Sequence, residues 1–220
     1  KIAEHRAFYQ ITPLTDRLNY CSSPINNMGW HMTVEKLLNI EIPKRVQYMR
    51  VIVMELARIA DHIICNGILG VDTGAFSGFL YLMQEREFIY EIYEEICGAR
   101  LTTNIGRIGG FERDFNDIAF AKINEFVNRF PAVLDDFQEL FVRNRIFIER
   151  TSGVAAVTPE QALEYSWSGP ILRATGVDYD VRISDPYCSY EEFDFEVPVG
   201  TTGDVYDRFM VRNDEMRQSM

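Results

Sequence analysis

The fold is decided by a long apolar stretch, residues 44–69, which reads KRVQYMRVIVMELARIADHIICNGIL. Within it apolar residues recur at helical spacing, at Met49, Ile52, Leu56, Ile59 and Ile63. Other apolar residues cover most of the remaining surface of such a helix, a pattern typical of a helix that is buried nearly all round. The stretch therefore predicts a central helix of a mainly α fold.

Three polar residues of this stretch, Glu55, Arg58 and His62, fall on one line along the helix, at i, i+3 and i+7. Charges inside a protein need partners, because an unpaired buried charge is strongly destabilising. An internal ion-pair ladder that satisfies His62 is the favoured interpretation. A catalytic group on this line is the alternative.

Further helices are expected on both sides of the central one. A glycine-containing turn at 67–75 leads into a second apolar helix at 75–97, and two long helices joined by a short turn form an antiparallel pair. Residues 24–39 predict a helix with an apolar stripe, which leaves His31 off the stripe as a surface or interface residue. Residues 1–10 are expected to be the end of a helix. Other helices are expected at 118–142 with a kink or break at Pro131, at 159–166, and from Asp204 onward.

Residues 169–203 are rich in Gly, Pro, Asp and Tyr and predict loops, with a small sheet at most from 179–183 and 193–197. The expected architecture is a long antiparallel helix bundle with a small, irregular β/loop region in the C-terminal third. We expect residues 1–220 to form a single helical core domain. Neither end of the sequence carries a helix cap, so a fragment of a longer chain is expected.

Composition excludes several classes of function. With 220 residues, 47% of them hydrophobic, the chain can bury a sizeable core. A formal net charge of -11 argues against nucleic acid as a partner, because binding phosphates needs an excess of Lys and Arg. No run reaches the roughly 18 apolar residues of a transmembrane segment. The four scattered cysteines lack metal-site spacing and suit a reducing, cytoplasmic compartment.

Two polar segments stand out between the helices. Residues 16–27 are turn formers, yet Arg17, Tyr20 and Cys21 lie among them, a combination that indicates site chemistry on a loop. An ordinary helix connection with a structural tyrosine is the alternative. Residues 98–110 combine Arg100 and Arg107 with four glycines but lack the pattern of a phosphate loop. These glycines would allow the surface of another subunit or of a cofactor to approach closely.

The chain resembles a known family along its whole length. The residues that carry the resemblance are Asp16–Tyr20, Val34–Leu38, Gly98–Leu101, Asn144–Ile146, Asp194–Pro198 and Glu215–Ser219. Together they are similar to the 49-kDa subunit (the bacterial D subunit) of the proton-pumping NADH:quinone oxidoreductase, respiratory complex I. A more distant similarity is to the large subunit of nickel-iron hydrogenases, which implies a helix bundle of that type.

The resemblance implies a role in quinone reduction. Tyr20 matches a tyrosine that hydrogen-bonds the quinone headgroup, and Arg17 and Ser22 match positions lining the same cavity. Asp72 matches an aspartate that pairs with a headgroup-binding histidine, which would lie upstream of Lys1. The family's N-terminal β region and C-terminal end are accordingly expected to be missing here, and the isolated fragment is expected to be inactive.

The same resemblance implies partners. Arg107, together with Arg100, is expected on the face that docks the iron-sulfur subunit, which holds the terminal cluster. Thr102 stands where some members of the family have a histidine linked to the redox state of that cluster. Cys21 lies near the position of a metal-binding C-x-x-C in hydrogenases but is alone, so no metal is expected.

The expected function is therefore that of a peripheral subunit at the cytoplasmic face of the inner membrane, coupling electron transfer to proton translocation. Quinone would be the substrate, and no cofactor is expected in this chain itself. Expected partners are the iron-sulfur subunit, a 30-kDa-type subunit and a quinone-channel membrane subunit. A structural scaffold derived from a hydrogenase fold, with no substrate contact, is the alternative function.

Overall fold

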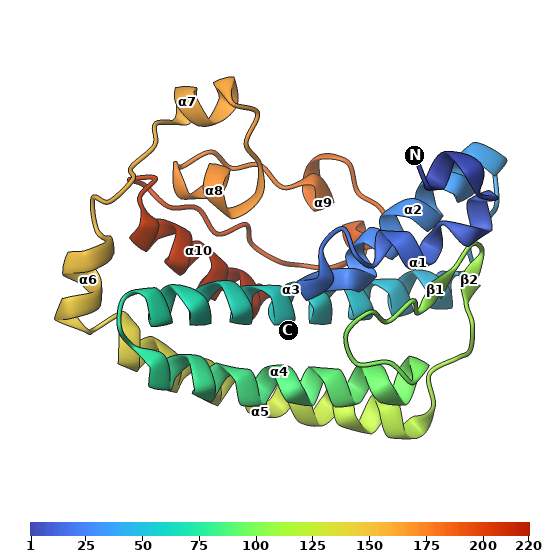
Figure 1. Ribbon diagram of the computed structural model, residues 1–220, viewed down its shortest axis with the longest axis horizontal. Coiled ribbons are helices and arrows are strands. Elements are labelled where there is room, and N and C mark those ends of the chain that lie inside the picture. Colours follow the sequence, from blue (N-terminus) through green and yellow to red (C-terminus); the bar gives the residue numbers. More distant parts are fainter. The chain divides into compact units, whose positions relative to one another are not determined.

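The computed structural model describes all 220 residues, and the chain is mainly helical (Figure 1). The long helices are α2 (Ser23–Leu38), α3 (Lys44–Asp72), α4 (Phe76–Cys97), α5 (Asp117–Phe141) and α10 (Val205–Gln218). The short ones are α1 (Thr12–Thr15), α6 (Arg145–Thr151), α7 (Pro159–Glu164), α8 (Gly169–Ala174) and α9 (Val181–Ser184). Single 3-10 turns are η1 (Ala3–His5), η2 (Phe8–Gln10), η3 (Tyr20–Ser22) and η4 (Tyr190–Glu192).

The mainly α prediction is confirmed, but the position of the β structure was wrong. Residues 181–184 form α9, and 193–197 form no strand. The two strands, β1 (Gly106–Arg107) and β2 (Gly110–Phe111), instead lie in the glycine-rich segment and pair antiparallel. Gly109 turns the chain between them with φ +91°, a conformation that a residue with a side chain rarely adopts.

The chain divides into two compact units. The first comprises residues 1–61 and 85–128, and the second comprises 62–84 and 129–220. Helices α3, α4 and α5 each contribute residues to both units. None of the helices is long and apolar enough to span a membrane.

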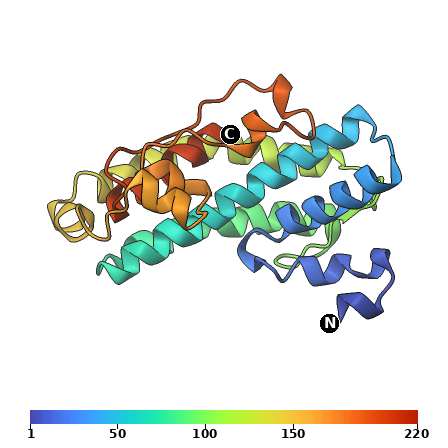
Figure 2. The ribbon, with the colours of Figure 1, turned by 90° about the horizontal axis from the view of Figure 1, so that it is seen from above.

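In the first unit, α2 does not bury the face that its apolar stripe predicts. Ser23, Asn27, His31 and Glu35 lie on its buried face at intervals of four residues. Both α1 and β1 contact α2, whose ribbon is seen from above in Figure 2. The polar row bonds to Thr12 and Thr15 of α1 and lies against Gly106 of β1. The helix therefore packs through hydrogen bonds and ion pairs as well as through Met28 and Val34.

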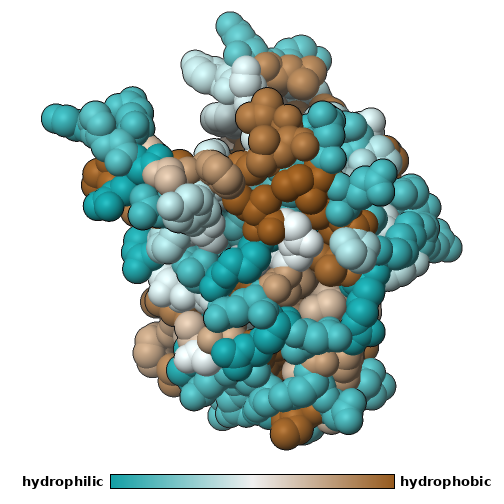
Figure 3. All heavy atoms as spheres, turned by 90° about the vertical axis from the view of Figure 1, so that its right-hand side faces the viewer, coloured by the Kyte–Doolittle hydropathy of each residue, from teal (hydrophilic) through white to brown (hydrophobic).

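The apolar end of α2 is correspondingly exposed. Leu37 is 79% exposed and Leu38 53% exposed, and Ile40 of the following connection is 38% exposed. Figure 3 shows a hydrophobic area over the end of α2 and the connection to α3. Apolar patches on a protein surface are typical of sites covered by a partner.

The second unit has an aromatic core between α5, α6 and α10. The ring centroids of Phe137 and Phe141 lie 4.6 Å apart, and those of Phe147 and Phe209 lie 4.8 Å apart. A Cβ atom at Gly70 would come within 2.9 Å of the Phe141 ring, so α3 can approach this ring only because position 70 is glycine. Helix α5 continues through Pro131, so of the kink or break expected there the break was wrong.

Candidate functional site

In the first unit the loop after α1 is held by Asn19, the N-cap of η3. Its Oδ1 accepts a hydrogen bond from the Cys21 backbone N–H at 3.2 Å. Its Nδ2 donates to Ser22 Oγ at 2.7 Å and to Asp61 Oδ1 on α3 at 3.2 Å. The turn that carries Tyr20 is thereby closed on itself by Asn19 and joined to α3 through Asp61.

The three residues of this loop that the sequence singles out differ in exposure. Tyr20 is 62% exposed, and Arg17 is exposed and donates to the Pro13 carbonyl. Ser22 is buried under the turn. The loop thus exposes the Tyr20 phenol and the Arg17 guanidinium, whereas Ser22 bonds to Asn19 within the turn.

Beneath the loop, the polar row of α2 binds main-chain atoms of neighbouring segments. Ser23 donates to the Leu101 carbonyl at 2.6 Å. Asn27 Nδ2 donates to the Thr12 carbonyl at 3.2 Å and to Thr15 Oγ1 at 2.8 Å. These bonds connect α2 to α1 on one side and to the glycine-rich segment on the other.

His31 is fully buried, so its expected place at the surface or at an interface was wrong. Its Nε2 lies 3.1 Å from Thr12 Oγ1, and a Cβ atom at Gly106 would come within 2.7 Å of Nδ1. Burial, and then the nearby Arg50 guanidinium, lower the pKa of His31 to about 4. The ring is therefore neutral at physiological pH.

The last member of the row, Glu35, forms a buried ion pair with Arg50 of α3. Two bonds of 2.7 and 2.6 Å join the guanidinium to the carboxylate. Glu35 Oε1 also accepts the Gly109 N–H at 2.7 Å, and Arg50 donates to the Arg107 carbonyl at 3.3 Å. Burial alone would raise the pKa of Glu35, but the bonds from Arg50 and Gly109 outweigh burial and lower it. The pair clamps the β1–β2 hairpin onto α2 and α3.

The two arginines expected at a docking face are both paired within the first unit. Arg107 Nη2 lies 2.6 Å from Glu112 Oε2, and its Nη1 donates to the Asn104 and Gly106 carbonyls at 2.8 Å. Arg100 lies 3.1 Å from Glu94 and also pairs with Glu87. Both guanidinium groups are partly exposed.

In the second unit, Asp72 is the last residue of α3 and is exposed. Thr73 closes the helix by donating to the Leu69 carbonyl at 2.9 Å, and Gly74 follows with φ +93°. Tyr20 belongs to the first unit and Asp72 to the second. Their joint role stays a prediction.

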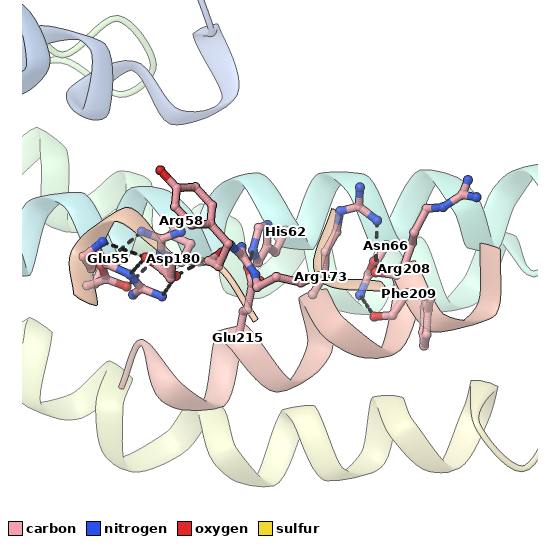
Figure 4. A network of polar contacts seen from close by, with 12 residues as sticks. Glu55, Arg58, His62, Asn66, Arg173, Asp180, Arg208, Phe209 and Glu215 are labelled. Carbon is pink, nitrogen blue, oxygen red and sulfur yellow. Dashed lines mark hydrogen bonds and ion pairs between the residues drawn. The ribbon is translucent and has the colours of Figure 1, made fainter. Parts of the chain in front are cut away.

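His62 also lies in the second unit, in a buried network shown in Figure 4. Its Nε2 lies 2.6 Å from Glu215 Oε2, and Arg173 Nε donates to Glu215 Oε1 at 2.7 Å. Burial would raise the pKa of Glu215, but His62 and then Arg173 lower it. In the first unit, Arg58 pairs with Glu55 at 3.0 Å. His62 Nε2 therefore has its partner on α10, which agrees with a structural role for this histidine.

No group of three or more His, Cys, Asp or Glu side chains is arranged to hold a metal ion. None of the four cysteines forms a disulfide. At the loop, Tyr20 and Arg17 are exposed and can supply a hydrogen bond and a positive charge.

Comparison with known proteins decides the family. The model of the family described as respiratory-chain NADH dehydrogenase, 49 Kd subunit, matches residues 72–220. The chain belongs to this family. The 49-kDa family also accounts for the rest of the sequence, because curated relatives align with all of it.

Three relatives illustrate the similarity. The NADH-quinone oxidoreductase D 2 subunit of Cytophaga hutchinsonii is 70% identical over 220 residues, which are 100% of this chain and 56% of that protein. The D subunit of the same oxidoreductase from Flavobacterium johnsoniae is 69% identical over 100% of this chain and 53% of its own length. The C/D subunit from Bdellovibrio bacteriovorus is 46% identical over 100% of this chain and 39% of its own length. The chain thus spans about half the length of the first two relatives.

In this 49-kDa family member, sequence reasoning missed several buried polar residues of the first unit. Asp16, Asn27, Glu35 and Arg50 are all buried. A signal for α2 was present, because its polar residues recur every fourth position, which places them on one face of a helix. No comparable signal marks Glu215 as the partner of His62, since 153 positions separate them.

Proposed function

We propose that the full-length protein is a subunit of a proton-translocating NADH:quinone oxidoreductase and that its 16–22 loop forms part of the quinone reduction site. One observation carries this proposal. The loop presents Tyr20 at 62% exposure from a turn held by Asn19, above a row of buried polar side chains. An ordinary connection between helices does not need so many fixed bonds to hold a mostly exposed tyrosine.

In the proposed site Tyr20 donates a hydrogen bond to one quinone carbonyl. When quinone takes up electrons, negative charge develops on its oxygens, and a positioned donor stabilises that charge more than it stabilises the neutral ground state. Arg17, exposed beside Tyr20, is proposed to line the quinone site, and Ser22, which bonds to Asn19 beneath the turn, is proposed to support it from below. Asp72 acts indirectly, because it holds and polarises a histidine that is supplied from outside these residues. Carboxylates orient imidazoles in this way in other proteins.

The face bearing Arg100 and Arg107 is proposed to dock the iron-sulfur subunit, which holds the terminal cluster. The other proposed partners are a 30-kDa-type subunit and a quinone-channel membrane subunit, at the cytoplasmic face of the inner membrane. Two observations support an assembled state: the hydrophobic area at the end of α2, and a relative whose name joins C and D in one chain. Quinone is the proposed substrate, with no cofactor held by this chain.

The test is Tyr20→Phe in the assembled oxidoreductase. This change keeps the ring and removes only the donor. Hydrogen bonds to charged groups are worth about 1.5–3 kcal/mol, so quinone reduction should fall by roughly 10- to 100-fold. Assembly and electron transfer to artificial acceptors should persist.

Tyr9→Phe is the matched control, because Tyr9 is 64% exposed in the same unit. It should leave quinone reduction at the parental rate. If Tyr20→Phe also reduced quinone at that rate, the headgroup assignment would be wrong. The scaffold function, with no substrate contact, would then be favoured.

A further inference from the structure

We propose that Arg86, Tyr90 and Tyr93 of α4 form a buried binding site for one carboxylate, which the full-length protein supplies from a segment outside these 220 residues. All three side chains belong to the first unit. The proposed quinone chemistry uses none of them. The inference therefore goes beyond the proposed function and does not depend on quinone binding.

The three residues occupy one face of α4, at i, i+4 and i+7. All of them are buried, with Arg86 6% exposed, Tyr90 8% and Tyr93 3%. The guanidinium carbon of Arg86 lies 4.6 Å from the centroid of the Tyr90 ring, a distance at which the cation is attracted to the ring. Tyr93 follows one turn further along the same face.

Each of the three side chains carries a buried polar atom that has no hydrogen-bond partner. These atoms are Arg86 Nε and the hydroxyl oxygens of Tyr90 and Tyr93. Buried polar atoms are nearly always paired, because solvent cannot replace the missing bond. All three groups can donate a hydrogen bond, and a guanidinium cannot accept one. This face of α4 therefore needs an acceptor.

The acceptor has to carry a negative charge. A guanidinium stays protonated in proteins, and a buried charge without a counter-ion is strongly destabilising. The acids on the neighbouring turns bind Arg100 instead, namely Glu94 at 3.1 Å and Glu87. No carboxylate of the chain forms an ion pair with Arg86. Water could pair with a phenol, but it could not balance the charge of the guanidinium.

A carboxylate matches this set of donors. It accepts two parallel N–H bonds from a guanidinium, and it keeps further lone pairs for a phenol. The Tyr90 ring attracts the Arg86 cation but offers it no acceptor atom in the structure. One carboxylate could thus satisfy the guanidinium and a neighbouring hydroxyl together.

Two observations indicate that the carboxylate comes from the same polypeptide. Only 6% of Arg86 is exposed, so the site is closed to a ligand that diffuses in, and its occupant has to fold together with the unit. The relatives of this chain contain further polypeptide that could supply such a group, because the 220 residues span 56% and 53% of two of them.

The test is equilibrium unfolding of the full-length subunit carrying Arg86→Met, which keeps most of the side-chain bulk and removes the charge. If a carboxylate is bound, this variant leaves it buried and unpaired, and the unfolding constant should rise roughly 100- to 1,000-fold. Tyr93→Phe removes one bond to a charged group and should raise the constant by roughly 10- to 100-fold. Without a bound carboxylate both changes delete an unpaired group. Variants as stable as the parent, or more stable, would therefore refute the site.

Arg45→Met is the matched control, because Arg45 of the same unit also binds a carboxylate, Asp114, but is exposed. It should change the unfolding constant by about fivefold or less. Arg86→Lys serves if Arg86→Met fails to fold, since it keeps the charge but loses the fork of N–H groups. Its stability should lie between those of the parent and Arg86→Met. If Arg86→Lys were no more stable than Arg86→Met, charge would not be what this site needs, and the proposal would be wrong.

Charge reversal identifies the carboxylate. Arg86→Glu should destabilise the full-length subunit, because it places two carboxylates side by side. Changing one Asp or Glu outside residues 1–220 to Lys should then restore stability by about tenfold or more, since the ion pair is re-formed with the charges exchanged. If no such position restored stability, the carboxylate assignment would fail.

The source of the carboxylate is tested by comparing the isolated full-length subunit with the assembled oxidoreductase. The loss of stability in Arg86→Met should already be present in the isolated subunit. A loss that appeared only after assembly would assign the carboxylate to another subunit, and a loss that depended on added acetate would assign the site to a free anion. Either result would contradict the proposed source. None of these measurements involves quinone, so their outcome is separate from that of the Tyr20 assignment.

Discussion

At the scale of single residues, His31 and Glu35 on the polar row of α2 are held in their ionisation states by different causes. His31 has no contact with solvent, and its pKa is lowered to about 4 by burial and by the charge of Arg50. Glu35, four residues further along, stays ionised because Arg50 and the Gly109 N–H bind it directly. A neutral ring and a carboxylate thus lie on one helix face, each held in its state by its neighbours.

His31 leads to a prediction about acid stability. In the unfolded state the histidine has a pKa near 6.5 and is protonated below it. In the folded state the buried ring is protonated only below about pH 4. The unfolded state therefore binds more protons in this window, and stability is lost as pH falls through it. The full effect is about 3 kcal/mol, at roughly 1.36 kcal/mol for each pKa unit.

The measurement is chemical unfolding of the full-length subunit at a series of pH values. Between pH 7 and 4 the parent should lose about 3 kcal/mol more than His31→Gln, whose side chain does not titrate. His5→Gln, at an exposed position, should follow the parent. Equal losses in the parent and in His31→Gln would show that the ring is not held neutral.

At the scale of elements, the sequence predicted where helices lie better than which face they bury. Helices expected at 24–39, 75–97 and 118–142 agree within about a residue with α2, α4 and α5. The face of α2 could not be predicted from its apolar residues, because its packing is governed by polar bonds to segments distant in sequence. The 16–22 part of the loop was identified from its turn formers, which are a local feature, whereas residues 23–27 of the same stretch form the start of α2.

The buried clamp on the hairpin yields an element-scale prediction. Glu35→Gln leaves the Arg50 charge buried without its counter-ion, and Arg50→Met does the same to Glu35. Breaking one side of a buried pair costs about 3–5 kcal/mol. Replacing both partners with apolar residues, Glu35→Leu with Arg50→Met, should cost much less than the sum of the single changes.

Unfolding of the full-length subunit in urea measures this coupling in a double-mutant cycle. The exposed pair of Arg45 and Asp114, at 60% and 61% side-chain exposure, is the control and should show a coupling of about 1 kcal/mol or less. Additive costs at Glu35 and Arg50 would mean that the pair does not act as a unit. The hairpin would then be held mainly by its turn and its backbone bonds.

At the scale of the whole molecule, contacts between distant parts of the sequence could not be predicted from the sequence. The bond between His62 and Glu215 joins residues 153 positions apart, and no local sequence pattern predicts it. Membership of the 49-kDa family could be inferred because the matching residues are spread along the whole chain. Three long helices, α3, α4 and α5, each contribute residues to both compact units, and this division is visible only in the folded chain.

The whole assembly provides the test of the proposed docking face. Arg107 is only partly exposed, and its charge is opposed by Glu112 at 2.6 Å. A cation near an iron-sulfur cluster stabilises the reduced, more negative state, and an anion does the opposite. Arg107→Met should therefore lower the potential of the terminal cluster, whereas Glu112→Gln should raise it.

Redox titration of the cluster in the assembled oxidoreductase measures both shifts. Their opposite signs separate an electrostatic effect from general damage to the interface, which would disturb the cluster in the same way in both variants. Arg145→Met is a control in the second unit, where a guanidinium bound to Glu149 is removed from an exposed position. This control should leave the potential unchanged. If the potential stayed at the parental value in Arg107→Met and Glu112→Gln with normal assembly, the cluster would lie away from this face, and the partner that covers the hairpin would have to be sought elsewhere.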